Sequence, residues 1–239
     1  MSEPELSRAQ AQLAAFYELR AAEEPSQDPE AVLRFRKAIA AAALPSGERV
    51  LDLGAKWGGL ASSIKGAGLE VAYVGFDVSE VNAEAAAGEG LTFVRGDVGE
   101  ELPFDDGSFD CVFCLELLEH LPAPLKLFVE MRRILTDTGR AVVSVPNPYS
   151  WVEVVRELFG RHDTEGHLNS FPTPIMQNLA ALSGFRIDTR AGTSIRIPKT
   201  SRLVSTDSIL ARSRIYVLRP SEELVFAGRS LSDTPDSSS

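Results

Sequence analysis

A glycine-rich loop and a carboxylate further along the chain have the residue types and spacing of a nucleotide-binding site. The apolar run 49–53 leads into the loop 54–59 (GAKWGG), and a short helix-forming segment follows. Glycines at such a strand-to-helix turn allow the backbone to approach a nucleotide closely. Asp77 ends the next apolar run, at close to the spacing of about 20 residues that suits a carboxylate binding ribose hydroxyls. The loop is therefore predicted to hold a nucleotide-containing cofactor.

Further acidic residues recur at or near the ends of apolar runs. The third run ends in Gly96-Asp97-Val98, and the fourth continues into Cys114-Leu115-Glu116 and then Leu118-Glu119-His120. Ligands of a doubly wound sheet bind at the carboxyl ends of the strands. Asp52 lies inside the first run, where a charge is costly unless donors hold it. We expect backbone amides of the loop to bind its carboxylate, and we count Asp52 with the cofactor site.

The histidines are the candidates for proton transfer, because imidazole titrates near neutral pH. His120 follows the fourth run, where a substrate is expected, and a helix-start histidine bonded to the backbone is the alternative. His167 lies in the long connection 147–172, where it serves either catalysis or the ordering of a lid. His162 is expected at the surface. The acidic residues around His162 match no metal-ligand spacing, so no metal site is expected.

Composition excludes several classes of protein. The 239 residues suit a single domain, and 44% apolar and 24% charged residues are ordinary for a globular protein. The net charge of −10 argues against nucleic acid as a partner. No apolar run approaches the roughly 20 residues needed to cross a bilayer. The polar, acidic N-terminus is unlike a secretory signal, so we expect a cytoplasmic protein that does not act at a membrane.

The two cysteines form a single C-x-x-C, at Cys111 and Cys114. A zinc site would need a second pair, which the sequence does not have. Residues three apart on a strand point to opposite faces. Both cysteines are therefore expected to be reduced residues of the core.

Apolar runs alternate with helical segments from residue 49 onward. The runs are interpreted as buried strands at 49–54, 71–76, 91–95, 109–114 and 140–145, with two closing strands at 185–188 and 224–229. Helical composition or periodicity is found at 7–22, 29–43, 58–66, 80–88, 124–135 and from Thr173 to Gly184. Near-continuous apolar strands separated by helices indicate an α/β fold, with a mostly parallel sheet covered by helices on both faces.

Four segments, taken in order, resemble the class I S-adenosylmethionine-dependent methyltransferases, and within them the small-molecule, type 11-like branch. They are VLDLGAKWGG, VGFDVSE, RGDVGEELPFDDGSFDCVFCLELLEHL and SVPNP. The LPFDDGSFD segment followed by LEH is the most specific part. The resemblance covers roughly residues 30–229 and implies a Rossmann-like sheet of seven strands with an antiparallel last strand.

The resemblance also implies a domain organisation. N-terminal helices (1–44) would cover the cofactor site. The methyltransferase domain would span 45–229, and its segment 147–172 would form a lid over the substrate. The polar tail 230–239 is expected to be disordered.

On this resemblance, the first two strand ends would bind most of the cofactor. Gly54, Ala55 and Gly58 would let the backbone approach the methionine part of S-adenosylmethionine. Asp77 would bind the ribose hydroxyls, and Val78 would lie against the adenine.

The next two strand ends would complete the site. Asp97 would accept a hydrogen bond from the adenine amino group, and the Val98 amide would face a ring nitrogen. The stretch from Cys114 through Leu115 to Glu116 would line the sulfonium side. The acceptor would be a small molecule methylated at oxygen or nitrogen, and a homodimer is compatible with this function.

Lys56, itself counted with the cofactor site, departs from the G-x-G-x-G pattern of the family. We expect this position to keep an ordinary φ with its side chain pointing outward. One alternative is that Lys56 pairs with the cofactor's carboxylate. Another is a degenerate, non-catalytic domain that serves a partner protein. An NAD-dependent oxidoreductase is disfavoured, because it would also lack its middle glycine and gives no role to Asp97.

Overall fold

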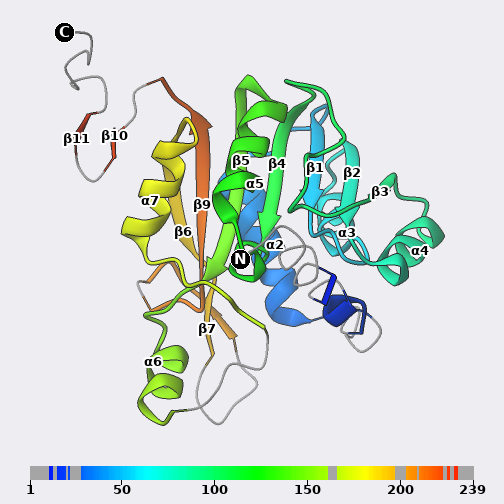
Figure 1. Ribbon diagram of the computed structural model, residues 1–239. Helices are drawn as coiled ribbons and strands as arrows, with labels where there is room; N and C mark the ends of the chain where they lie inside the picture. Colours follow the sequence, from blue (N-terminus) through cyan, green and yellow to red (C-terminus); the bar gives the residue numbers. More distant parts are fainter. Residues whose placement is uncertain are drawn as a thin grey trace, which may run out of the picture.

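The computed structural model of the protein is built around one seven-stranded β-sheet (Figure 1). It describes residues 11–12, 15–19, 21, 28–160, 166–196, 203–208, 210–222, 225–226 and 229–230. The strands lie in the order β3-β2-β1-β4-β5-β9-β6. Neighbours from β3 to β5 are parallel, while β9 is antiparallel to both β5 and β6. The predicted doubly wound sheet with an antiparallel last strand is confirmed.

The elements have the following bounds. The strands of the main sheet are β1 (Arg49–Leu53), β2 (Ala72–Asp77), β3 (Phe93–Arg95), β4 (Phe109–Leu115), β5 (Leu135–Pro146), β6 (Phe185–Gly192) and β9 (Ser213–Pro220). Two small sheets pair β7 (Ser194–Arg196) with β8 (Leu203–Ser205) and β10 (Val225–Phe226) with β11 (Arg229–Ser230). The helices are α2 (Pro29–Ala42), α3 (Gly59–Gly66), α4 (Glu80–Gly88), α5 (Pro124–Ile134), α6 (Trp151–Leu158), α7 (Thr173–Leu182) and the 3-10 turn η1 (Leu118–His120).

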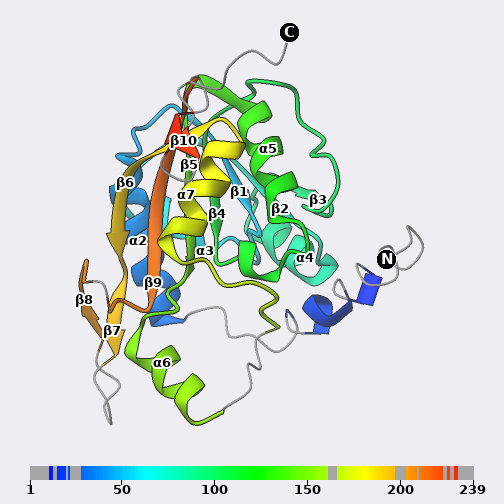
Figure 2. The ribbon, with the colours of Figure 1, turned by 60° about the vertical axis from the view of Figure 1, so that its left-hand side comes forward.

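Helices cover both faces of the sheet and create two cores (Figures 1 and 2). On one face α2 and α3 bury side chains such as Ile39 and Leu60. On the other, α5 and α7 bury Phe128 and Met176. These helices begin and end near the predicted positions. Asp28 and Pro29 start α2 as a capping residue followed by a proline, because the Asp28 carboxylate accepts from the Glu30 amide.

The two cysteines behave as predicted for strand residues of the core. Both are free and buried, and they belong to the two different cores, Cys111 under α2 and α3 and Cys114 under α5 and α7. Burial raises the pKa of Cys111 to about 12 and that of Cys114 well above its usual value. Buried thiols of this kind stay protonated and unreactive at neutral pH.

The predicted closing strand at 224–229 is wrong. Residues 225–226 and 229–230 form the separate pair β10–β11, and the seventh strand of the main sheet is β9. A strand between two others in a sheet covered on both faces needs a continuous apolar run. Ile215, Tyr216, Val217 and Leu218 supply that run and are all buried.

The connection 147–172 contains the helix α6, which the sequence analysis does not predict. Ser150 caps this helix by accepting from the amide of Glu153. After α6 the structure describes residues 159–160 and 166–172, and the second of these segments leads into α7 (Figure 2). Among the residues that the structure describes, every helix is too short or too polar to cross a bilayer.

The segment LPFDD (102–106) is fixed by α5. Glu130 accepts from the Leu102 amide at 2.9 Å, and the Arg133 guanidinium donates to the carbonyls of Leu102 and Phe104 and to the Asp106 carboxylate. Leu102 is itself buried. The most specific part of the sequence resemblance therefore has a structural task, which is to set the path from β3 into β4.

Candidate active site

The glycine loop leaves β1 at the edge where the parallel strands end. The amides of Gly54 and Ala55 donate to the carbonyl of Phe76 on β2, at 2.8 and 3.2 Å. Gly58 has φ +89°, and a Cβ there would lie 2.3 Å from a methyl carbon of Leu91. The positive φ favours glycine here, and the backbone of Gly58 packs closely against the side chain of Leu91.

The expectation of an ordinary φ at Lys56 is wrong, because its φ is +48°. This left-handed conformation costs a non-glycine residue roughly 1–2 kcal/mol. The backbone amide of Lys56 donates to Oδ2 of Asp77 at 2.9 Å, and this bond offsets part of the strain. The residue is exposed, in agreement with an outward side chain.

Asp77 is the central acceptor of this edge. It is 8% exposed, and its Oδ1 accepts from the amide of Ser79 at 3.0 Å and from the side chain of Asn82 at 3.4 Å. Together with the Lys56 amide, these donors hold the carboxylate in one orientation. A carboxylate accepts about four hydrogen bonds, so capacity for a hydroxyl remains.

Asp52 is held by a side chain and not by the loop amides that the sequence suggested. It is 4% exposed, and the hydroxyl of Tyr73 on β2 donates to its Oδ2 at 2.7 Å. Burial raises the pKa of Asp52 to about 7, against the lowering effect of the Tyr73 hydrogen bond, and the charge of Asp77 adds to the rise. Asp52 therefore carries little negative charge below neutral pH.

The next strand end carries Asp97 and Val98. Asp97 closes a local turn, in which its Oδ1 accepts from the Gly99 amide at 2.7 Å, and Val98 is buried. The path of this turn is thus fixed by the residue that was predicted to bind adenine.

Val78 lines a depression together with Ala15, Glu18, Glu80 and Arg95. Glu18 comes from the helical N-terminal segment, and its carboxylate accepts from the amides of Glu80 and Val81 at the start of α4. The N-terminal segment therefore contacts the end of β2 beside Val78.

Glu116 joins four elements just beyond β4. Its Oε1 accepts from the Ser144 hydroxyl at 2.8 Å, and its Oε2 accepts from the Ser213 hydroxyl at 3.1 Å and lies 3.4 Å from the guanidinium of Arg34. Leu115 beside it is half-buried, whereas the Cys114 side chain is buried in the core and can offer the site only its backbone.

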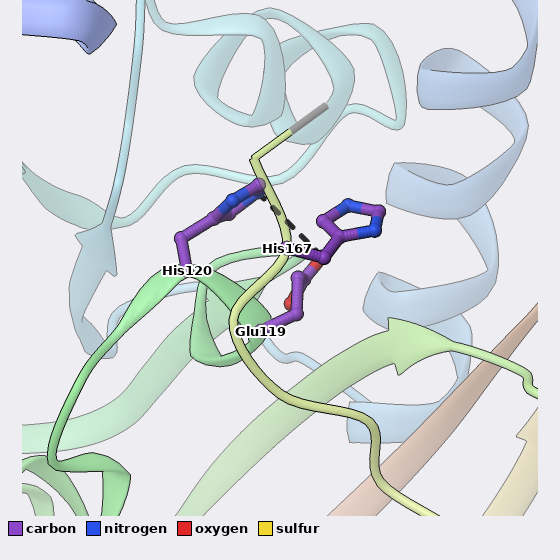
Figure 3. A group of neighbouring side chains, drawn as sticks. All are labelled: Glu119, His120 and His167. Atoms are coloured by element: carbon purple, nitrogen blue, oxygen red, sulfur yellow. Dashed lines mark ion pairs between the residues drawn. The ribbon is translucent and has the colours of Figure 1, made fainter. Parts of the chain in front are cut away.

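The two candidate histidines His120 and His167 lie together (Figure 3). Their ring centroids are 4.9 Å apart, and Nε2 of His120 is 3.9 Å from Oε1 of the buried Glu119. The amides of Leu168 and Asn169 donate to the carbonyl of Glu119, which fastens the segment after His167 to η1. The sequence analysis assigns no role to Glu119. His162 lies outside the described residues.

Tyr73, Arg34, Ser144 and Ser213 are site residues that the sequence analysis missed. Each lies in a strand or helix whose pattern indicates only packing. Their convergence depends on pairing between distant segments, for which the sequence carries no local signal.

Comparison with known proteins decides the family. A family model described as a methyltransferase domain matches residues 25–190, more than half of the chain. The chain belongs to this family. The resemblance to the class I methyltransferases is thereby confirmed.

Curated relatives match the methyltransferase over part of its length. An uncharacterized methyltransferase of Mycobacterium sp. (strain KMS) is 39% identical over 100 residues, which are 42% of this chain and 39% of the relative. A ubiquinone biosynthesis O-methyltransferase of Vibrio campbellii is 31% identical over 107 residues, which are 42% of this chain and 45% of that protein. The chain thus spans less than half of the length of these relatives.

Solved structures share the fold of this methyltransferase. A methyltransferase of Thermotoga maritima, described as SAM-dependent and as a possible histamine N-methyltransferase, superposes with a TM-score of 0.64 at 21% identity. The match covers 78% of this chain and 90% of that one. At this identity the likeness establishes the Rossmann-like sheet and no more.

Proposed function

We propose that this methyltransferase binds S-adenosylmethionine at the glycine loop and transfers its methyl group to an oxygen or nitrogen of a small molecule. The observation that carries this proposal is the contact between the loop and Asp77. The backbone of the glycine loop and an oriented carboxylate meet at the carboxyl ends of β1 and β2. Methyl transfer is the activity of the family.

The residues present fit the cofactor. Asp77 has acceptor capacity left for a ribose hydroxyl, and Val78 offers an apolar surface beside it for adenine. Asp97 and the Val98 amide would bind the adenine edge, and the backbone from Gly54 to Gly58 would receive the methionine part. Asp52, largely protonated below neutral pH, keeps this end of the site from becoming strongly anionic.

The chemistry is an in-line displacement, for which the bound cofactor supplies a methyl group already activated by a sulfonium. The acceptor atom forms a bond to the methyl carbon, and the sulfur leaves with the electron pair of the broken bond as a thioether. The protein's part is to align the acceptor and to remove its proton where it has one. Leu115 and Glu116 would border the reacting atoms. His120 and His167 lie at the adjoining acceptor side.

Two segments would enclose the site. The contact of Glu18 with the start of α4 supports a cover formed by the N-terminal helices within 1–44. The fastening of residues 168–169 to η1 supports a lid formed by 147–172. The ubiquinone biosynthesis O-methyltransferase and the possible histamine N-methyltransferase among the similar proteins support a small-molecule acceptor. The location that we propose is the cytoplasm.

Calorimetric titration tests this proposal. Purified protein should bind S-adenosylmethionine and S-adenosylhomocysteine, whereas NADH serves as the negative control. The Asp77→Ala variant should bind both at least about ten-fold more weakly, because a charged hydrogen-bond acceptor is lost. Asp137→Ala is the matched control, since the side chain of Asp137 is 96% exposed.

The fold of each variant is checked by its thermal melt. Absence of binding to the wild-type protein would overturn the proposal and favour a non-catalytic, partner-binding domain. Unchanged binding by a folded Asp77→Ala variant would overturn the ribose assignment.

A further inference from the structure

Three possible metal ligands meet at the carboxyl end of β4. Glu119 and His120 come from η1, and His167 comes from the segment that lies against this turn. One carboxylate oxygen of Glu119 and one imidazole nitrogen from each histidine all lie within 4.8 Å of one another. Figure 3 shows the Glu119 carboxylate beside the two rings, with a dashed line that joins it to the ring of His120. No single stretch of sequence contains this group.

The orientation of the His120 ring is that of a metal ligand. Its Nδ1 faces the carbonyl oxygen of Gly166 at 3.4 Å, and its Nε2 lies 3.9 Å from Oε1 of Glu119. A carbonyl only accepts hydrogen bonds, so Nδ1 is the protonated nitrogen in this contact. In the neutral ring, the lone pair of Nε2 then faces the negatively charged carboxylate of Glu119, and the two repel each other. A cation between them would be attracted to both. Metal-binding histidines commonly bond one nitrogen to a backbone carbonyl and leave the other for the metal.

Glu119 lies at the buried side of this group. This residue is 1% exposed, so bulk water has little access to its carboxylate, and a shielded surrounding of this kind is a feature of metal sites in proteins.

The backbone around the group is braced. The amides of Leu168 and Asn169 donate to the carbonyl of Glu119 at 2.7 and 3.0 Å, and the Asn169 side chain donates to the carbonyl of Leu121 at 2.6 Å. His167 immediately precedes these contacts. Its position relative to η1 is therefore set by the chain itself, as a preorganised site requires.

We propose that Glu119, His120 and His167 bind one divalent transition-metal ion, with zinc as the best match. Two imidazoles and one carboxylate form a ligand set of catalytic zinc sites, whereas magnesium and calcium prefer oxygen ligands. With zinc bonds of about 2.1 Å, tetrahedral ligand atoms lie about 3.4 Å apart. Side-chain rotations that shorten the distances between the donor atoms by up to roughly 1.4 Å would bring them to that spacing.

Three protein ligands leave a fourth position open, and this position would face the acceptor. The following role rests on the proposed function. An acceptor hydroxyl bound to the metal would lose its proton to water more readily. Its oxygen would then attack the methyl carbon while the carbon–sulfur bond breaks. The two histidines would thus promote deprotonation of the acceptor by holding the metal, without taking up the proton themselves. The favoured acceptor would be a hydroxyl compound and not an amine.

Metal titration of the tag-free, chelator-treated protein tests this inference. Zn²⁺ binding is followed by calorimetry, and Co²⁺ binding by the visible absorption of a four- or five-coordinate ion. One equivalent of each should bind per chain. The Glu119→Gln and His167→Ala variants should bind at least about 100-fold more weakly. Glu89→Gln, which alters an exposed glutamate, should bind as the wild type does.

Each outcome decides between stated alternatives. Substoichiometric binding, or tight binding by folded variants, would overturn the inference and leave a protonated His120 paired with Glu119. If Glu119→Gln does not fold, His167→Ala decides, because His167 is only half-buried. The metal titration needs no S-adenosylmethionine, so its failure is distinguishable from a failure of cofactor binding.

Discussion

Replacing Asp52 with asparagine should make the stability of this protein less dependent on pH. Burial raises the pKa of Asp52 to about 7, although the Tyr73 hydroxyl donates to its carboxylate. The usual pKa of an aspartate, expected in the unfolded chain, is 3.8. Asparagine keeps an oxygen that can accept from Tyr73 and removes the titrating group.

The sign and size of the effect follow from these two pKa values. Between about pH 4 and pH 7 the folded protein holds a proton on Asp52 that the unfolded chain releases. The free energy of unfolding therefore falls as the pH rises through this window. Each pH unit well inside this window corresponds to about 1.4 kcal/mol, and the slope falls off as the pH reaches the folded pKa. The wild type therefore loses about 2 kcal/mol between pH 5 and pH 7 from this group, and nearly 3 kcal/mol by pH 8. The Asp52→Asn variant is free of this loss.

Urea unfolding at pH 5 and pH 8 measures the difference. At each pH the free energy of unfolding of the wild type is subtracted from that of the variant. This difference should be about 3 kcal/mol more positive at pH 8 than at pH 5. Asp137→Asn, at a side chain that is 96% exposed, should show no comparable change. An equal stability difference at both pH values would refute the reasoning, because it would mean that Asp52 is ionised in the folded protein at pH 5.

Two further predictions concern the glycine loop. Lys56→Gly should raise the free energy of unfolding in urea by about 0.5–1 kcal/mol, since glycine relieves the left-handed strain but gains unfolded-state entropy. Its affinity for S-adenosylmethionine should stay unchanged in calorimetry, because the contact to Asp77 is made by the backbone; a ten-fold loss would instead indicate a side-chain contact to the cofactor. Gly58→Ala should lower the free energy of unfolding by about 1–3 kcal/mol, since its Cβ would meet Leu91 at a positive φ. A Gly58→Ala variant as stable as the wild type would contradict the close approach described here.

The sheet was largely predictable because most of its strands have a recognisable local sequence pattern. Apolar runs such as those of β1 and β4 can only be buried on both faces, and proline or glycine marks the helix ends. The position of the seventh strand was not predictable in this way. Both 213–220 and 224–229 contain strand-forming residues, and pairing with β5 selects the first.

The start of helix α6 has a recognisable signal in the sequence. Ser150 followed three residues later by Glu153 is a capping-box pattern. The prediction for this connection, a lid over the substrate, came from the family resemblance, which carried no helix at 151–158.

The positions of Asp77 and Asp97 were predictable because each residue ends or closely follows a single strand. Their roles in cofactor binding remain predictions. The candidate site was not predictable where partners converge from distant segments. The hydroxyl that holds Asp52 comes from the neighbouring strand, and the partners of Glu116 come from a helix and two other strands. Likewise, the positive φ of Lys56 accompanies a hydrogen bond from its amide to the carboxylate of Asp77, which comes from the next strand.

The place of β9 in the sheet also constrains how the chain can fold as it is made. β6 pairs only with β9 among the described strands, and β9 is synthesised after it. Until residue 220 has emerged from the ribosome, β5 is an open edge and β6 has no strand to join. Open edges invite pairing with other chains. The nascent protein therefore keeps β5 as an exposed edge until β9 pairs with it, and the same pairing gives β6 its place in the sheet.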